Sequence, residues 1–189
     1  MKTILKFCLA LTVLQSCVTP KYIAPEHLDP QFTSITNDTI YILSLADIRK
    51  NSKDVFKKEN YLRKNMLRYL SKKNYNAVFT TSEKILAEKI SYEQLINYDE
   101  KIESYLGNAS QRYVFLTVLM EQESTSCGIG KRAGLTISGF VFDKLNRRLL
   151  WKNVGSGSDT SFGLMAIASS GLSIDEAAYE LMQGLPKRK

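Results

Sequence analysis

The residue whose surroundings point most directly to chemistry is Cys17. It closes the sequence Leu-Gln-Ser-Cys at positions 14–17, so a leucine stands three positions before a thiol and a small residue stands directly before it. Lys2 and Lys6 precede the apolar run 7–14, which is too short to span a bilayer. This order resembles a lipobox, in which cleavage exposes a cysteine that accepts diacylglycerol. We therefore predict a signal peptide at 1–16 and a lipid modification of Cys17 that includes a palmitate chain.

Other residue types that could do chemistry lack the partners they need. Cys8 would leave with the signal, so Cys127 is the one remaining free thiol, and His27 is the chain's single histidine. A thiol nucleophile needs a nearby base, and a metal site needs more ligands than these. The segment 126–132 contains two glycines and a lysine, but it fails the spacing of a phosphate-binding loop. We expect no catalytic residues, no metal and no cofactor.

Composition and charge limit the class of protein and its partners. Hydrophobic residues make up 44% of the chain and charged residues 24%, which is typical of a globular protein. The formal net charge is +7, and without Lys2 and Lys6 there remain 24 basic and 19 acidic side chains, a net charge of +5. A basic surface can meet anionic lipid, a cell-wall polymer or nucleic acid. An envelope location argues against nucleic acid, so the basic excess is interpreted as serving either contact with the membrane surface or solubility.

The chain after the signal divides into a tether and one domain. Residues 17–38 carry three of the four prolines and show little hydrophobic periodicity. We interpret them as the lipidated cysteine followed by a linker, which could stretch to roughly 70 Å. The folded part is predicted to be a single domain at 39–189, long enough for one hydrophobic core.

The first half of the domain reads as a strand, a helix and a second strand. Residues 39–45 form an apolar, β-rich run, residues 55–73 place apolar side chains at helical spacing, and residues 77–80 form a short strand. Such a βαβ unit makes the two strands parallel. The polar face of the helix is basic, which also suits a membrane-surface helix, although covering a sheet is the commoner use of an apolar stripe.

Further along, shorter helices lead to a central strand and a hairpin. A helix is possible at 82–88, a capping box begins another at Ser91, and 99–106 has helical spacing. The apolar run 113–120 is the predicted central strand. The alternating segment 135–142 and its return at 149–154 must be antiparallel neighbours, and a final helix capped by Ser173 and Glu176 ends at Pro186. The predicted fold is α/β and three-layer-like, with flanking helices, a mixed sheet of about five strands, a parallel βαβ start and a C-terminal antiparallel hairpin.

Two features in the C-terminal part of the domain, Trp151 and the segment 155–172, each allow two interpretations. Trp151 is either packed under a helix or an anchor for a partner. The glycine- and serine-rich segment 155–172 is interpreted as a connection around an apolar patch. That patch is either a short core helix or an exposed interaction surface. As a working hypothesis we take the second, with an interaction surface formed by Phe162, Leu164, Met165 and Ile167.

The order of elements and the hairpin sequence resemble a known family. Val141-Phe142-Asp143, followed by a turn and by Leu149-Leu150-Trp151, is similar to a hairpin of a family of Gram-negative outer-membrane lipoproteins of uncharacterised function. Their α/β domain is similar to the N-terminal domain of TolB and to secretion lipoproteins of the CsgG type. The resemblance implies an accessory or assembly role in envelope transport, secretion or maintenance. It carries no catalytic residues, so we expect no enzyme.

The residues after Cys17 bear on the location of the protein. Val18 and Thr19 supply no aspartate after Cys17 of the kind that retains some lipoproteins in the inner membrane. By resemblance to the sorting rules of bacterial lipoproteins, the lipid anchor is expected in the outer membrane with the domain facing the periplasm. The expected partner there is an envelope protein or further copies of the same chain. The alternative function is an enzyme or ligand-binding module that acts on cell-wall or lipid material through carboxylates.

Overall fold

The computed structural model describes residues 24–35, 38–49, 56–79, 91–107, 109–127, 130–162 and 172–188. The elements in these ranges, in chain order, are β1 (His27–Leu28), the 3-10 helix η2 (Pro30–Ser34), β2 (Thr39–Ile42), β3 (Ala46–Asp47), α2 (Glu59–Lys72), β4 (Asn76–Val78), α3 (Tyr92–Asn97), α4 (Glu100–Leu106), β5 (Tyr113–Cys127), β6 (Gly130–Asp143), β7 (Arg148–Phe162) and α6 (Leu172–Gln183).

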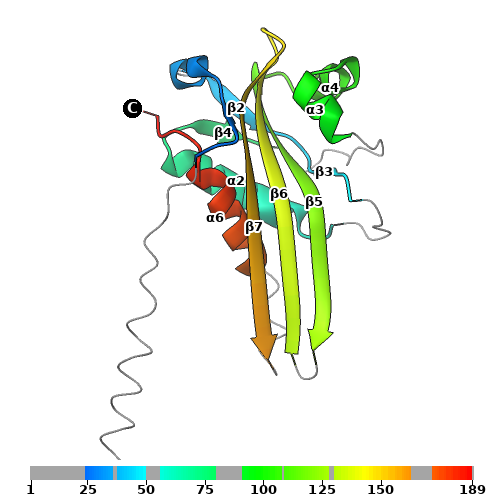
Figure 1. Ribbon diagram of the computed structural model, residues 1–189. Helices are drawn as coiled ribbons and strands as arrows, with labels where there is room; N and C mark the ends of the chain where they lie inside the picture. Colours follow the sequence, from blue (N-terminus) through cyan, green and yellow to red (C-terminus); the bar gives the residue numbers. More distant parts are fainter. Residues whose placement is uncertain are drawn as a thin grey trace, which may run out of the picture.

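One mixed sheet of seven strands organises the domain (Figure 1). Its order is β1-β7-β6-β5-β2-β4, with β3 pairing β5 beyond the end of β2. β2 runs parallel to both β4 and β5, whereas β6 runs antiparallel to its two neighbours, β5 and β7. The α/β class, the parallel start and the antiparallel hairpin are therefore confirmed. The predicted count of about five strands is wrong, because β1 and β3 have two residues each and leave no pattern in the sequence.

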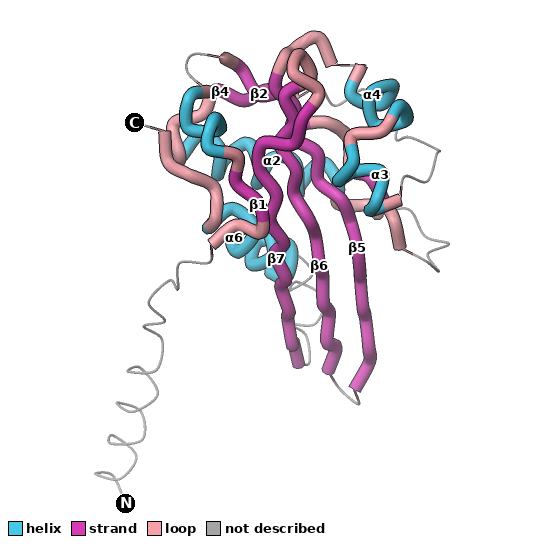
Figure 2. Tube along the Cα trace, turned by 45° about the horizontal axis from the view of Figure 1, so that its top comes forward, coloured by secondary structure: helices cyan, strands magenta, loops and turns pink. Residues whose placement is uncertain are grey.

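Helices cover both faces of the sheet, which gives three layers. One cluster of buried residues joins α2 and α6 to one face, and a second joins α3 and α4 to the other. β6 shows the division directly: Leu135 and Ile137 belong to the first cluster, and Phe140 and Phe142 to the second. Figure 2 shows β5, β6 and β7 running side by side well past the region that α3 and α4 cover.

Local signals explain where the helices begin and end. α2 buries Leu62, Met66 and Leu70 at four-residue spacing, and the chain turns out of it at Asn74, whose φ is 67°. The capping box predicted at Ser91 is present at the start of α3. α6 begins at Leu172, one residue before its predicted cap. The helix expected at 82–88 lies outside the described residues. No described helix is long and apolar enough to cross a membrane.

Trp151 lies in the core. It is fully buried, its Nε1 donates a hydrogen bond to the carbonyl oxygen of Gly184 at 3.1 Å, and its ring lies 5.9 Å from that of Phe115. The interpretation of a strand tryptophan packed under a helix is confirmed, and the alternative of an exposed partner anchor is wrong.

The glycine-rich stretch after Trp151 is a strand rather than the start of a connection. β7 continues through Gly155 and Gly157 to Phe162, paired throughout with β6. A side chain at Gly157 would place a Cβ 2.0 Å from the carbonyl oxygen of Ser173, and one at Gly155 would lie 2.2 Å from that of Ala177. The glycines therefore let the backbone of α6 lie directly on β7, a packing role that glycines in a sequence do not distinguish from a loop.

The predicted boundary between tether and domain is also wrong. Residues Glu26–Ile35, which we name the N-terminal strap, belong to the domain: β1 pairs with β7, and Phe32 and Ile35 are buried in the first core cluster. Asp29 caps the 3-10 helix by accepting a hydrogen bond from the Gln31 amide at 2.7 Å, and Pro30 opens that helix. A proline is favoured at this position because its φ suits a helix start, so here it marks structure instead of a linker.

Candidate functional site

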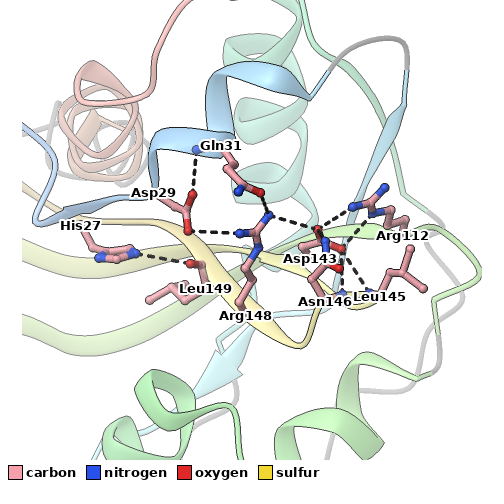
Figure 3. Close-up of polar contacts among 9 residues, drawn as sticks. All are labelled: His27, Asp29, Gln31, Arg112, Asp143, Leu145, Asn146, Arg148 and Leu149. Carbon is pink, nitrogen blue, oxygen red and sulfur yellow. Dashed lines mark hydrogen bonds and ion pairs between the residues drawn. The ribbon is translucent and has the colours of Figure 1, made fainter.

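A group of charged side chains lies where the N-terminal strap meets the β6–β7 turn (Figure 3). Asp143 ends β6 and is 1% exposed. Its Oδ1 accepts hydrogen bonds from the amides of Leu145 at 3.1 Å and Asn146 at 3.3 Å, and its Oδ2 accepts one from Asn146 Nδ2 at 2.7 Å. An aspartate that bonds the backbone two and three residues ahead fixes a tight turn, and Arg147 completes it with a φ of 51°.

Two arginines neutralise the Asp143 carboxylate. Arg112, which directly precedes β5, donates from Nε to Oδ1 at 2.9 Å and from Nη2 to Oδ2 at 2.8 Å, and Arg148 Nη2 lies 3.8 Å from Oδ2. Burial opposes ionisation of Asp143, but the hydrogen bonds from Arg112 and Asn146 outweigh it and hold the pKa of Asp143 below its usual range. The carboxylate is thus kept ionised and paired.

Arg148 also connects this turn to the N-terminal strap. Its Nη1 lies 3.6 Å from Asp29 Oδ2, and its Nη2 donates to Gln31 Oε1 (Figure 3). The Asp29 amide donates to the Leu150 carbonyl oxygen at 2.8 Å. One guanidinium therefore bridges a carboxylate of the hairpin and two side chains of the strap.

The rest of the N-terminal strap follows the edge of β7. Lys152 Nζ lies 2.6 Å from Glu26 Oε2, and His27 Nε2 lies 3.3 Å from the Leu149 carbonyl oxygen. Burial disfavours charge on Lys152, but its hydrogen bonds to Glu26 and Tyr92 prevail and raise its pKa. Because a carbonyl oxygen only accepts, the proton of this His27 contact sits on Nε2. These contacts hold a segment in place, so we interpret the cluster as an attachment site for the strap.

The predicted site residues can be placed only in part. Cys17, Leu164, Met165 and Ile167 lie outside the described residues, and Phe162 is the last residue of β7, its side chain not described. Lipidation and the interaction surface therefore stay predictions. Sequence reasoning missed the attachment site, although an aspartate followed by a proline, with Phe32 and Ile35 three residues apart, was a usable signal for a short helix.

A second polar feature lies on the long strands. A groove of about 240 Å³ has Gly134 and Thr136 of β6 in its lining, together with Glu121 and Glu123 of β5 and Glu176 of α6. Glu176 is committed to the sheet, because its Oε2 accepts the Ser158 amide of β7 at 2.8 Å. Within the described ranges, no group of three or more histidine, cysteine or acidic side chains is placed to hold a metal ion.

The fold is similar to that of solved structures, although no similar sequence is found. No family model matches the sequence, and no curated protein matches it. A PelC dodecamer structure from Paraburkholderia phytofirmans is similar at 13% identity over 80% of this chain and 89% of that chain, with a TM-score of 0.50. The lipoprotein GNA1162 from Neisseria meningitidis is similar at 10% identity over 66% of this chain and 84% of that one, with a TM-score of 0.47.

A third solved structure, the LpoB C-terminal domain from Salmonella enterica, is similar at 10% identity over 78% of this chain and 91% of that one, with a TM-score of 0.34. At 13% identity, the likeness to PelC concerns the fold alone. The expected similarity to TolB and to CsgG-type lipoproteins stays a prediction.

Proposed function

We propose that this protein is a non-enzymatic lipoprotein of the bacterial envelope, anchored through Cys17 in the outer membrane with its domain facing the periplasm. The observation that carries this proposal is the lipobox at 14–17 behind a charged start and a short apolar run. Its role would be that of an accessory or assembly component in envelope transport, secretion or maintenance.

The N-terminal strap supports this proposal and shortens the expected distance between the domain and the membrane. Glu26 is the first residue of the strap, nine positions after Cys17. Nine extended residues span at most about 30 Å, so an acylated Cys17 would hold the domain far closer to the membrane than the roughly 70 Å expected for a free linker. A domain fastened at that distance has a restricted orientation, which suits a fixed component of an envelope assembly.

Self-association is the form of assembly we favour. The PelC structure that shares this fold is a dodecamer, and closed rings of identical subunits are a common way to build symmetric assemblies. Phe162, Leu164, Met165 and Ile167 are the residues we propose for the contact between copies or with an envelope partner, because they form an apolar cluster in a serine- and glycine-rich segment.

The test is the native mass of the acylated protein extracted in mild detergent, with copurifying proteins identified. We expect either a closed oligomer or a defined complex with another envelope protein. Leu164→Asp with Ile167→Asp should reduce either species to the monomer while the thermal unfolding midpoint stays within a few degrees. A wild-type monomer without any copurifying protein would contradict the assembly role, and unfolding of the double variant would assign the segment to the core.

A second candidate, a module that binds or cleaves cell-wall or lipid material, rests on the glutamate-lined groove. Glu121 and Glu123 lie two residues apart on β5, so their side chains share one face about 7 Å apart along the strand. We rank it second because Glu176 is bonded to the sheet and His27 lies at the strap, on β1. Loss of binding or turnover of a cell-wall fragment in Glu121→Gln with Glu123→Gln would favour this candidate.

A further inference from the structure

A line of exposed side chains, four cations and one tyrosine, runs along α2 and the turn before it. The line consists of Lys57, which lies in that turn, and Tyr61, Lys64, Arg68 and Lys72 of α2, and we name these five residues the α2 stripe. The other exposed residues of α2 are Asn60 and Ser71, so no acidic side chain interrupts its exposed face. At 1.5 Å per residue the stripe is about 22 Å long.

The packing of α2 fixes the direction of this stripe. Leu62, Met66 and Leu70 are at most 1% exposed and pack in the core cluster on the opposite side of the helix. Glu59, the one acid of α2, accepts the Leu45 amide at 2.9 Å and lies 3.9 Å from the buried Arg63. The helix therefore cannot rotate its cations toward the sheet without exposing its apolar side.

Few acidic groups offset the stripe. Asp175 of α6 lies 3.9 Å from Arg68 Nη2 and accepts a hydrogen bond from the Tyr61 hydroxyl at 2.8 Å. Lys57, Lys64 and Lys72 have no carboxylate within ion-pair distance among the described residues. Tyr179 of α6, 42% exposed, packs beside Tyr69 of α2 with ring centroids 6.1 Å apart. The surface thus combines tyrosines with lysines that have no carboxylate partner in the described part of the chain, and Lys72 Nζ lies 5.5 Å from the centroid of the Tyr69 ring. Lysine and tyrosine are both favoured at membrane interfaces.

The C-terminal end of the α2 stripe lies beside the attachment of the N-terminal strap. The ring of Phe32 in the strap is 5.8 Å from that of Tyr75, which follows α2 after a two-residue turn. The Tyr75 hydroxyl donates to the Pro186 carbonyl oxygen at 2.9 Å, and the Arg188 amide donates to the Lys73 carbonyl oxygen at 3.0 Å. The strap therefore contacts the C-terminal end of α2 through the buried side of that helix, while its first residue, Glu26, pairs with Lys152 beside Tyr92 of α3.

We propose that the α2 stripe binds the anionic phospholipid headgroups of the membrane that holds the anchor. The proposal rests on the proposed lipidation of Cys17, because the reach of about 30 Å from Cys17 to Glu26 keeps the domain near that surface, where the stripe is its exposed basic face without a carboxylate partner for Lys57, Lys64 and Lys72 among the described residues. Each lysine close to an anionic membrane strengthens binding about fivefold, so two lysines contribute about 25-fold. The orientation of the domain would then be set by two attachments, the acyl chains and α2.

The experiment measures vesicle binding of the mature chain, residues 17–189, carrying Cys17→Ser so that no acyl chain contributes. Binding to vesicles of phosphatidylglycerol and phosphatidylcholine is compared with binding to pure phosphatidylcholine by flotation. Lys64→Gln with Lys72→Gln is the test variant. Lys101→Gln with Arg132→Gln is its control, because it removes the same charge from exposed positions on α4 and β6. Circular dichroism confirms that both variants fold.

We expect the test variant to bind the anionic vesicles about 25-fold more weakly and the control less than about threefold more weakly. Equal losses in the two variants, equal binding to both kinds of vesicle, or unchanged binding of the test variant would each overturn the proposal. So would wild-type binding to a soluble polyanion without binding to vesicles, which would assign the stripe to an acidic polymer. Acylation of Cys17 is read separately from the mass of the N-terminal peptide, so the two proposals can fail independently.

Discussion

Arg112 and Asp143 form a bidentate pair, with Nε to Oδ1 at 2.9 Å and Nη2 to Oδ2 at 2.8 Å. The pair joins the residue before β5 to the last residue of β6. The same carboxylate fixes the β6–β7 turn and faces Arg148, which holds Asp29 and Gln31 of the N-terminal strap. The position of the strap therefore depends on a carboxylate more than one hundred residues away in the chain.

Replacement of Asp143 by asparagine should make the free energy of unfolding depend less on pH in the acidic range. The pKa of Asp143 is lower in the folded protein than in the unfolded chain, where it is about 3.9. The stabilisation that the ionised carboxylate provides is therefore complete above the unfolded pKa and is lost as the pH falls through the folded pKa. Wild-type protein should lose stability on acidification from about pH 5 to pH 2, and Asp143→Asn should lose less over that range. The variant should be roughly 2 kcal/mol less stable at pH 7.

Urea unfolding at several pH values between 2 and 7 measures this difference. Glu100→Gln, at an exposed position of α4, is the control and should follow the wild-type profile. Parallel profiles for wild type and Asp143→Asn would show that the carboxylate carries no such linkage.

Gly157→Ala should destabilise the contact between β7 and α6. A Cβ at this position would lie 2.0 Å from the Ser173 carbonyl oxygen and 2.6 Å from the Ala177 amide nitrogen, both backbone atoms that cannot rotate away. We expect a loss of roughly 2–3 kcal/mol in the free energy of unfolding. Gly134→Ala is the matched control on β6, because the nearest atom to its Cβ would be 3.9 Å away. Thermal unfolding of both variants measures the difference. Equal midpoints would argue against the close approach of the α6 backbone to β7 at Gly157.

Phe32→Ala tests whether the N-terminal strap is part of the folded domain. Phe32 is fully buried in the core cluster, so its truncation should cost roughly 3–4 kcal/mol. Leu28→Ala in the same strap should cost less than about 1 kcal/mol, because Leu28 is 39% exposed. A Phe32→Ala variant as stable as wild type in urea would return residues 26–35 to the tether.

The features that the sequence predicts well are those with a strong local period. The alternation of Leu135 to Phe142 assigns side chains to the two core clusters correctly, and the spacing of Leu62, Met66 and Leu70 identifies α2. A strand, a helix and a strand in that order require parallel pairing, which β2 and β4 show.

The features that the sequence did not predict depend on contacts between distant segments. β1 has two residues and owes its form to the edge of β7, and Gly155 and Gly157 have the composition of a loop until α6 is seen to lie on them. The pairing of Arg112 with Asp143 joins residues 31 positions apart that show no shared motif. Among the candidate residues, the burial of Trp151 could be predicted because a strand tryptophan is most often buried.

The most direct test of the account is the mass of the N-terminal peptide of the mature protein purified from bacterial membranes. We expect a chain that begins at Cys17 and carries a diacylglyceryl group, and we expect Cys17→Ala to lose both the modification and membrane retention. A mature chain that begins elsewhere, or an unmodified Cys17 in membrane-bound protein, would contradict it.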